Sequence, residues 1–320
     1  METIGYFYGV SGKKLQRQYK DYLSDYQEWK QKDHAKQWLL FPENMGPYLS
    51  IDETALSKGE LYTLVTNKEA KGKKGAIVGI FAGTKVEPII TQLKTIQRDK
   101  RLKVKEITLD MANSMKEIAT KCFPNASQVS DRFHVQKLAL EALQDIRIKH
   151  RWEALDQENE DLKQAKQKGL SFKPKLFSNG DSRKQLLARS RYLLYKSPEK
   201  WTANQKARSL ILFTEYPDIQ KAFQLVQGLR IIYNKSKTKE GAYTQLAHWY
   251  REVEESGFKS FNTIVNTISL NYRSVLNYFN HRSTNASAES FNAKIKAFRA
   301  QFRGVKKVEF FLFRLTRIFA

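Results

Sequence analysis

The sequence predicts an α/β fold in which a mixed β-sheet is flanked by helices and followed by a long helical region. Residues 48–84 contain three short runs rich in β-branched and aromatic residues, and residues 86–133 alternate between helix-like and strand-like patterns. After Phe133 the strand signals almost vanish and helical periodicity takes over. Strands that are followed by alternating helices and strands are typical of a mixed sheet covered by helices.

The first three strands are expected at residues 48–56, 60–69 and 75–84. They are separated by Ser-Lys-Gly and by a cluster of glycines and lysines, which are residue types that form tight turns. Because short turns join antiparallel neighbours, we predict an antiparallel meander.

The rest of the sheet is expected as helix 86–98, strand 104–111, helix 113–123 and strand 126–133. The order of elements is therefore βββαβαβ. This order predicts a sheet with helices packed on it.

Two further regions complete the predicted organisation, a helical lead-in at residues 1–46 and a long helical region at 141–280. In the lead-in, apolar and aromatic residues recur at spacings of four, three, four and three, which places them on one face of a helix. These residues are Leu15, Tyr19, Tyr22, Tyr26 and Trp29. The lead-in has seven Lys or Arg and six Asp or Glu, so it is not expected to be a basic DNA-reading module.

The composition favours a polyanionic partner. Lys and Arg number 56 against 33 Asp and Glu, which gives a net charge of +23 and a pI near 9.8. Nucleic acid is the partner that such a charge favours. The sequence has no apolar run long enough to span a membrane and no signal peptide, so we expect a cytoplasmic protein. Its single cysteine, Cys122, excludes an intramolecular disulfide and a cysteine-rich zinc site, and we expect it in the core.

Three acidic residues are candidates for catalysis. Asp52 ends one apolar run, Asp110 ends another, and Glu289 lies in a helical segment near the end of the chain. Side chains at the carboxyl ends of neighbouring strands converge on one crevice, and a helix packed there can supply a third group. Clustered carboxylates repel one another unless a cation neutralises them, and oxygen ligands suit Mg²⁺ or Mn²⁺.

The helix that carries Glu289 has two distinct faces. Its apolar face consists of Phe291, Ile295, Phe298 and Phe302. Its polar face consists of Glu289, Asn292, Lys296 and Arg303. With about 100° between successive residues, the first face is expected to pack and the second to lie at the rim of a site for a phosphate backbone.

Each candidate also has a structural interpretation. An aspartate after a strand commonly caps a turn or a helix, and Glu289 alone is an ordinary exposed helix residue. Asp131 and His134 are secondary candidates: Asp131 follows the last predicted strand, and His134 is placed to orient a carboxylate or to touch phosphate. A cap at Asp131 and a locally bonded histidine are the alternative.

Basic residues are concentrated in residues 281–320, which contain nine Lys or Arg and only two Glu. We expect this stretch to follow the phosphates of DNA. The predicted DNA-binding residues are Arg282, Asn285, Asn292, Lys294, Lys296, Arg299, Arg303, Lys306 and Lys307. The turn lysines Lys71, Lys73 and Lys74 are further candidates, although exposed turn lysines commonly contact only water.

Four segments carry a resemblance to a known family: residues 50–56, 108–126, 130–147 and 284–299. Their sequences are SIDETAL, TLDMANSMKEIATKCFPNA, SDRFHVQKLALEALQDIR and TNASAESFNAKIKAFR. They resemble the ISL3-type DDE transposases of bacterial insertion sequences, in the ISAon1-like branch.

The resemblance implies that Asp52, Asp110 and Glu289 are the catalytic, metal-binding residues and that they hold two Mg²⁺ or Mn²⁺ ions. It implies an RNase H-like core in residues 47–140, interrupted by an all-helical insertion at 141–280 and completed by a catalytic helix and basic tail at 281–320. The activity that it implies is metal-dependent cleavage and strand transfer of the DNA of an insertion sequence.

The resemblance also implies partners. These are double-stranded DNA at the element ends and target, other copies of the chain in an oligomer on DNA, and a separate small helix-turn-helix protein that recognises the ends. The chain is then expected to be associated with the nucleoid when it is bound to DNA. Two alternatives remain: a catalytically inactive or domesticated DNA-binding protein, and a metal-dependent nuclease outside transposition. The presence of all three acids argues against decay.

Overall fold

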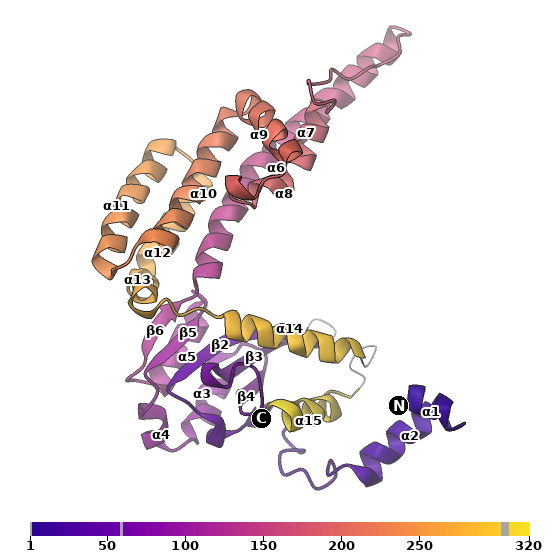
Figure 1. The fold of residues 1–320 in the computed structure, drawn as a ribbon, viewed down its shortest axis with the longest axis vertical. Helices are drawn as coiled ribbons and strands as arrows, with labels where there is room; N and C mark the ends of the chain where they lie inside the picture. The colour runs from indigo at the N-terminus through magenta and orange to yellow at the C-terminus, as the bar shows by residue number, and fades with distance from the viewer. Residues whose placement is uncertain (1, 58–59, 302–306) are drawn as a thin grey trace. The chain divides into compact units, whose positions relative to one another are not determined.

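The computed structural model describes residues 2–57, 60–301 and 307–320 (Figure 1). The chain forms two compact units, one of residues Met1–Asp131 with Ser283–Ala320 and the other of Arg132–Arg282. The change of unit at Arg132 comes earlier than the expected residue 141, because one helix begins there and continues without a break. In the described part of the chain, no helix is long and apolar enough to cross a membrane.

The first unit contains a six-stranded mixed sheet in the order β1-β4-β3-β2-β5-β6. The strands are β1 (Trp38–Leu40), β2 (Tyr48–Ser57), β3 (Glu60–Asn67), β4 (Ile77–Ala82), β5 (Glu106–Leu109) and β6 (Ser127–Ser130). Strands β2, β3 and β4 form the antiparallel meander, and β1 adds to β4. Strands β2, β5 and β6 are parallel. The mixed sheet is confirmed, whereas β1 lies in the predicted helical lead-in and was missed.

One face of the sheet is covered by helices of the segment that connects β4 to β5 and β5 to β6. These helices are α3 (Val86–Lys94), α4 (Arg98–Leu102) and α5 (Asn113–Cys122). Leu49 and Ile51 of β2 pack on this side with Ile107 of β5 and Ile118 of α5. Because side chains alternate along a strand, Ser50, Asp52 and Thr54 of β2 point to the other face.

The opposite face is covered by α14 (Ala286–Gln301) and α15 (Val308–Phe319) from the end of the chain. Their apolar side chains join strand residues in a second core. It includes Leu39, Leu56, Leu64, Ile77, Ile80, Phe291, Ile295, Phe311, Leu312 and Leu315. The predicted apolar face of α14 therefore packs as expected in its described part, and Phe298 lies against the same core. Figure 1 shows α14 running over the sheet near β2 and β3.

The lead-in does not form the single helix that its sequence pattern predicts. It contains α1 (Glu2–Phe7), α2 (Gly12–Gln18) and one π-helical turn at Tyr19–Leu23, after which Ser24 is extended (φ −105°, ψ 150°). Beyond this break, the ring centroid of Tyr26 is 5.1 Å from that of Phe310, and the ring centroid of Trp29 is 5.4 Å from that of Phe313. The regular spacing of aromatic residues therefore reflects packing on α15, and the prediction of one continuous helix was wrong.

The described regular elements of the second unit are helices, apart from an isolated bridge between Leu176 and Ser182. They are α6 (Arg132–Gln167), α7 (Arg183–Arg189), α8 (Arg191–Leu194), α9 (Ala203–Glu215), α10 (Pro217–Lys235), α11 (Lys239–Ser256), α12 (Lys259–Leu270) and α13 (Tyr272–His281). Helix α10 packs against α6 and α11.

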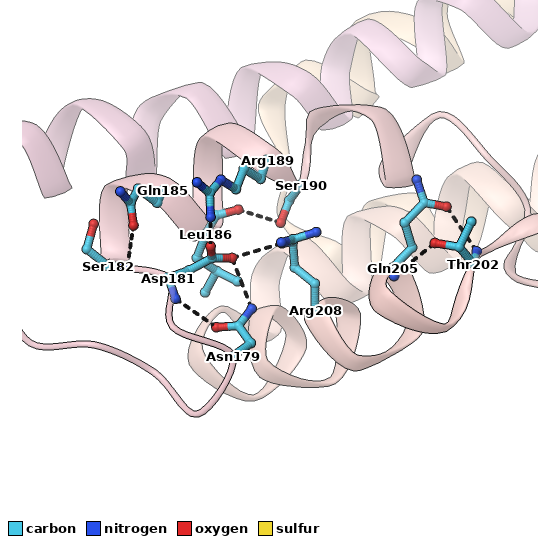
Figure 2. Close-up of polar contacts among 10 residues, drawn as sticks. All are labelled: Asn179, Asp181, Ser182, Gln185, Leu186, Arg189, Ser190, Thr202, Gln205 and Arg208. Atoms are coloured by element: carbon cyan, nitrogen blue, oxygen red, sulfur yellow. Dashed lines mark hydrogen bonds and ion pairs between the residues drawn. The ribbon is translucent and has the colours of Figure 1, made fainter.

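A buried carboxylate organises the start of α7 (Figure 2). Asp181 has a fully buried side chain and accepts hydrogen bonds from Arg189, from Arg208 Nε (2.9 Å) and from Asn179 Nδ2 (2.9 Å). Burial raises the pKa of Asp181, but the hydrogen bonds from Arg208 and Arg189 outweigh it, so its pKa lies below the usual value. These contacts tie the segment before α7 to α9.

Candidate active site

Two of the candidate acids lie just beyond the paired part of the neighbouring parallel strands β2 and β5. Ser50 of β2 is in register with Thr108 of β5, and Asp52 and Asp110 each come two residues later in the chain; Asp110 directly follows β5, whereas Asp52 lies in the middle of β2 and not at the strand end that the sequence predicts. Neighbouring strands are separated by about 4.8 Å. The sheet therefore brings the backbones at Asp52 and Asp110 to one edge, as the strand pattern predicts.

A third acid at this edge, Glu53, is influenced by both aspartates. Burial raises the pKa of Glu53, and the negative charges of Asp110 and Asp52 raise it further. Both aspartates thus act on one carboxyl group. Glu53 was not a candidate from the sequence, because the residue follows Asp52 within a strand and has no motif of its own.

Helix α14 is attached to β2 by hydrogen bonds between side chains. Ser50 Oγ donates to Asn285 Oδ1 (2.6 Å), just before the helix, and Asn292 Nδ2 donates to Asp52 Oδ2 (2.6 Å). Seven helical residues advance about 10 Å and the two strand residues from Ser50 to Asp52 about 7 Å, a difference that lies within the reach of the side chains. These bonds are therefore compatible with a helix that runs along the strand.

The third candidate acid lies between these two contacts. Glu289 is four residues after Asn285 and three before Asn292, so the three residues share one face of the helix. Its side chain is exposed in the first turn of α14. Glu289 is therefore placed over β2. In the described residues, however, no three His, Cys, Asp or Glu side chains form a group that could hold a metal ion.

The aspartates also make local hydrogen bonds. Asp52 Oδ1 accepts from its neighbour's amide, Glu53 N (2.8 Å), and Asp110 Oδ1 accepts from Ala112 N (2.7 Å). The second bond is the turn that the structural interpretation of Asp110 expects. One oxygen of each carboxylate is therefore fixed by the backbone.

The residues present fit a hard divalent cation. The side chains at the edge offer carboxylate and amide oxygens, which are the ligands that Mg²⁺ and Mn²⁺ prefer. In addition, Asn292 Oδ1 is a buried atom with no hydrogen-bond partner among the residues that the structure describes, while its Nδ2 is bound to Asp52. An amide oxygen in this position is an available metal ligand or acceptor.

Comparison with known proteins shows the family of the chain. The model of a family described as transposase, of the ISL3 type, matches residues 49–315, which span β2 to α15. The chain belongs to the ISL3 transposase family.

Two groups of relatives are similar over most of the chain. The transposase for insertion sequence element IS1001 of Bordetella parapertussis is 22% identical over 275 residues, 85% of this chain and 61% of the relative. The transposase for IS1557 of Mycobacterium tuberculosis is 24% identical over 258 residues, 78% of this chain and 54% of the relative. The matched part of the chain thus spans between half and two thirds of the length of these relatives.

The predicted DNA-binding residues of this ISL3 family member have different environments. Asn285 is 1% exposed and holds Ser50, and the guanidinium of Arg282 donates to the carbonyls of Tyr233 and Ser236. Tyr233 lies in the last turn of α10 and Ser236 directly after it, so both side chains serve the fold in this structure.

The remaining basic residues lie on or near α14. Lys294 Nζ donates to Gly72 O (2.8 Å), which ties α14 to the turn with the candidate lysines, and Arg299 Nη1 donates to Ala55 O (3.4 Å). Side chains of Lys71, Lys73, Lys74, Lys296 and Lys307 are exposed. Phe302, Arg303 and Lys306 lie outside the described residues.

The secondary candidates belong to different units. Asp131 directly follows β6 in the first unit and is 1% exposed. His134 is half-buried in α6 of the second unit, where its ring contacts Phe133 edge to face.

Two lysines near this edge of the sheet were not predicted as site residues. Lys68, in a short turn after β3 (Lys68–Ala70), donates from Nζ to Thr108 Oγ1 (2.7 Å) and lies 3.5 Å from Glu106 Oε1. Burial lowers the pKa of Lys68, while the charges of Glu106 and Asp131 act in the opposite direction. Burial likewise lowers the pKa of Lys116 of α5, while the charge of Asp110 acts in the opposite direction. The one sequence signal for such a lysine was Glu106, a charged residue inside the apolar run before Asp110.

The single cysteine is structural. Cys122 is fully buried, and burial raises its pKa to about 11. Its thiol therefore remains protonated at neutral pH and is no nucleophile, which confirms the prediction of a core residue.

Proposed function

We propose that this chain is a DDE transposase that cleaves and joins DNA strands of an insertion sequence. In this proposal the first unit is an RNase H-like core and the second is an all-helical insertion before the catalytic helix α14. The observation that carries the proposal is the hydrogen bond from Asn292 to Asp52. It attaches α14 to the edge where Asp52 and Asp110 meet and places Glu289 on the same helix face.

The proposed roles follow from the positions of the side chains. Asp52 and Asp110 bind Mg²⁺ or Mn²⁺, and Glu289 completes the ligand set. Bound divalent ions supply Lewis-acid activation of water or of a DNA 3′-hydroxyl and stabilise the leaving oxygen. Asn292 holds the Asp52 carboxylate in one orientation. No covalent link between protein and DNA is required.

The positive charge of the chain provides the DNA-binding surface. A net charge of +23 and exposed lysines along α14 and the nearby turn favour phosphate contacts with double-stranded DNA. We propose that element ends and target are both bound, by an oligomer of the chain, with a separate helix-turn-helix protein to recognise the ends. Such a protein is cytoplasmic and is associated with the nucleoid when it is bound to DNA.

A second candidate function is DNA binding without catalysis. The observation that favours it is that the described acids do not form a ready group of three metal ligands. The two functions differ in whether DNA is cut.

The test is strand cleavage of DNA that carries the termini flanking the encoding gene. We expect nicks at these termini in Mg²⁺ or Mn²⁺ and none in EDTA. Asp52→Asn, Asp110→Asn and Glu289→Gln should each abolish cleavage while DNA binding persists. Asp99→Asn is the matched control, because Asp99 is an exposed acid of α4. DNA binding without cleavage by the parent chain would support the second function.

A further inference from the structure

A buried arginine of the second unit makes hydrogen bonds to neutral groups only. Arg147 of α6 is 4% exposed. Its guanidinium donates from Nε to Gln144 Oε1 (2.7 Å) and from Nη1 to Leu187 O (2.9 Å). Within residues 2–57, 60–301 and 307–320, no Asp or Glu forms an ion pair with Arg147. A positive charge that is buried without a counter-charge costs free energy, and an anion that reaches it offsets this cost.

Hydrogen-bond donors around this charge are not used by the fold. The guanidinium has its N–H donors on three nitrogens, and the two bonds of Arg147 start from Nε and Nη1. Its Nη2 therefore makes no hydrogen bond to a residue that the structure describes. Gln144 is 5% exposed, and its Nε2 is a buried donor that also has no partner in the described part of the chain. Unused donors beside a buried cation form an arrangement that can bind an anion.

Two more arginines lie next to Arg147. Arg151 follows it by one turn of α6, on the same face of the helix. Arg191 begins α8, four residues after Leu187, whose carbonyl accepts the bond from Arg147, and α8 contacts α6. Arg151 and Arg191 are exposed. Burial lowers the pKa of Arg147, and the positive charges of Arg151 and Arg191 lower it further. Positive charge is thus concentrated at one place between α6 and α8.

The residues around this place favour a nucleic acid over a small anion. Residues 149–208 contain fifteen Lys or Arg and seven Asp or Glu. Trp152 follows Arg151 and Tyr192 follows Arg191, and both aromatic side chains are exposed. The Tyr192 ring centroid lies 5.6 Å from Arg191 Cζ. Arginines interleaved with exposed aromatic residues are typical of surfaces that bind nucleic acids.

We propose that the second unit has a binding site for a phosphate of the DNA backbone. The site, which we call the Arg147 site, consists of Gln144, Arg147, Arg151 and Arg191. The bonds to Gln144 and Leu187 hold the Arg147 guanidinium in one orientation, and the exposed arginines attract the phosphate. DNA contacts are then not confined to α14 and the turn of the first unit. The inference rests on the proposed function for DNA as the ligand, but it requires no cleavage.

The first test measures the salt dependence of DNA binding in EDTA, where DNA is not cut. The double variant Arg151→Gln with Arg191→Gln changes two exposed side chains, so the fold should be kept. We expect the slope of log affinity against log salt to fall by about 0.9, because one phosphate contact is lost, and affinity to fall on the order of tenfold at about 0.1 M salt. Arg251→Gln is the control, because Arg251 is exposed on α11 and bound to Glu255. It should leave the slope unchanged.

The second test addresses Arg147 with inorganic phosphate in place of DNA. Melting temperatures are compared in sodium phosphate and in sodium chloride at equal ionic strength. Phosphate should raise the melting temperature of the parent, because a ligand of the folded state stabilises it. Arg147→Met should lose this response. Arg208→Met is the control, because Arg208 is paired with Asp181, and it should melt at a lower temperature while the response to phosphate remains. If Arg147→Met does not fold, the double variant Arg151→Gln with Arg191→Gln takes its place and should show a weaker response.

Three results would overturn the inference. A salt slope of the double variant equal to that of the parent would show that DNA does not use the Arg147 site. A phosphate response that is lost in Arg147→Met while that slope is unchanged would indicate a site for free phosphate. A response that persists in Arg147→Met would leave Arg147 the role of holding the last turn of α7 through Leu187 O. A parent chain that does not cleave DNA would refute the proposed function alone, since neither measurement depends on cleavage.

Discussion

The contact between Asn292 and Asp52 gives a direct test of the candidate active site. Replacing Asn292 by alanine removes the 2.6 Å hydrogen bond to Asp52 Oδ2 and leaves the bond from Glu53 N to Oδ1. One oxygen of the carboxylate therefore stays fixed while the group gains freedom to rotate. We expect cleavage to be impaired and DNA affinity to change little.

The size of the effect follows from the type of bond. A hydrogen bond to a charged group contributes about 1.5–3 kcal/mol. If this is lost from the transition state, the rate falls roughly 10- to 150-fold, because about 1.4 kcal/mol corresponds to a factor of ten. The remaining bond from Glu53 favours the lower end of that range. Stability should change less, because alanine is a better helix former than asparagine by about 0.5 kcal/mol and offsets part of the lost bond.

The assay compares two quantities in the same buffer. Initial cleavage rates are measured across a series of Mn²⁺ concentrations, and DNA affinity is measured by fluorescence anisotropy at fixed salt. Ser290→Ala is the control, because Ser290 is exposed on the same helix. An Asn292→Ala variant that cleaves at the parent's rate but binds DNA more weakly would refute the reasoning. Asn292 would then be the DNA contact that its place in the basic segment predicts.

Three further outcomes are expected. Asp110→Asn should match or exceed the parent's melting temperature in EDTA, because like charges at the edge are relieved, and it should respond less to Mn²⁺; a less stable variant with a full response would make Asp110 a turn residue. Replacing Lys296 or Lys307 by alanine should each reduce the slope of log affinity against log salt by about 0.9, and an unchanged slope would place DNA elsewhere. Asp181→Asn should lower the free energy of unfolding by about 2–3 kcal/mol at pH 7, because its partners Arg189 and Arg208 are partly exposed and lose less than a fully buried pair would. The pKa of Asp181 is lowered in the fold, so its contribution is present above the unfolded value of about 3.9 and is lost as pH falls through the folded value; urea unfolding that shows an equal difference at pH 7 and pH 3 would contradict this.

The sheet was largely predictable because its signals are local. Buried runs bounded by turn residues gave five of the six strands, and their spacing gave the meander. Strand β1, Trp38–Leu40, is only three residues long and has too few positions to show alternation. The prediction of one helix in the lead-in was wrong because Tyr26 and Trp29 contact α15, which follows almost 300 residues later. Such a tertiary contact can imitate helical spacing.

The candidate site was predictable only where apolar runs along the chain define it. Asp52 and Asp110 each end an apolar run on neighbouring parallel strands, but the contacts of Lys68 and Glu53 depend on the order of strands in the sheet. Lys68 reaches Thr108 across β2, a relation that no spacing along the chain encodes. Asn292 was correctly placed on the polar face of its helix, but its bond to Asp52 joins residues 240 positions apart.

Closure of the sheet by α14 and α15 has a consequence for synthesis on the ribosome. Residues 1–131 emerge first, and the helices that cover one face of their sheet emerge only after residues 132–282 have been made. At about 5–20 residues per second, that face waits roughly 8–30 s for its cover. A message cut short within this interval yields a chain with an uncovered apolar sheet and without Glu289. We therefore expect truncated products to be inactive, prone to aggregation and bound by chaperones.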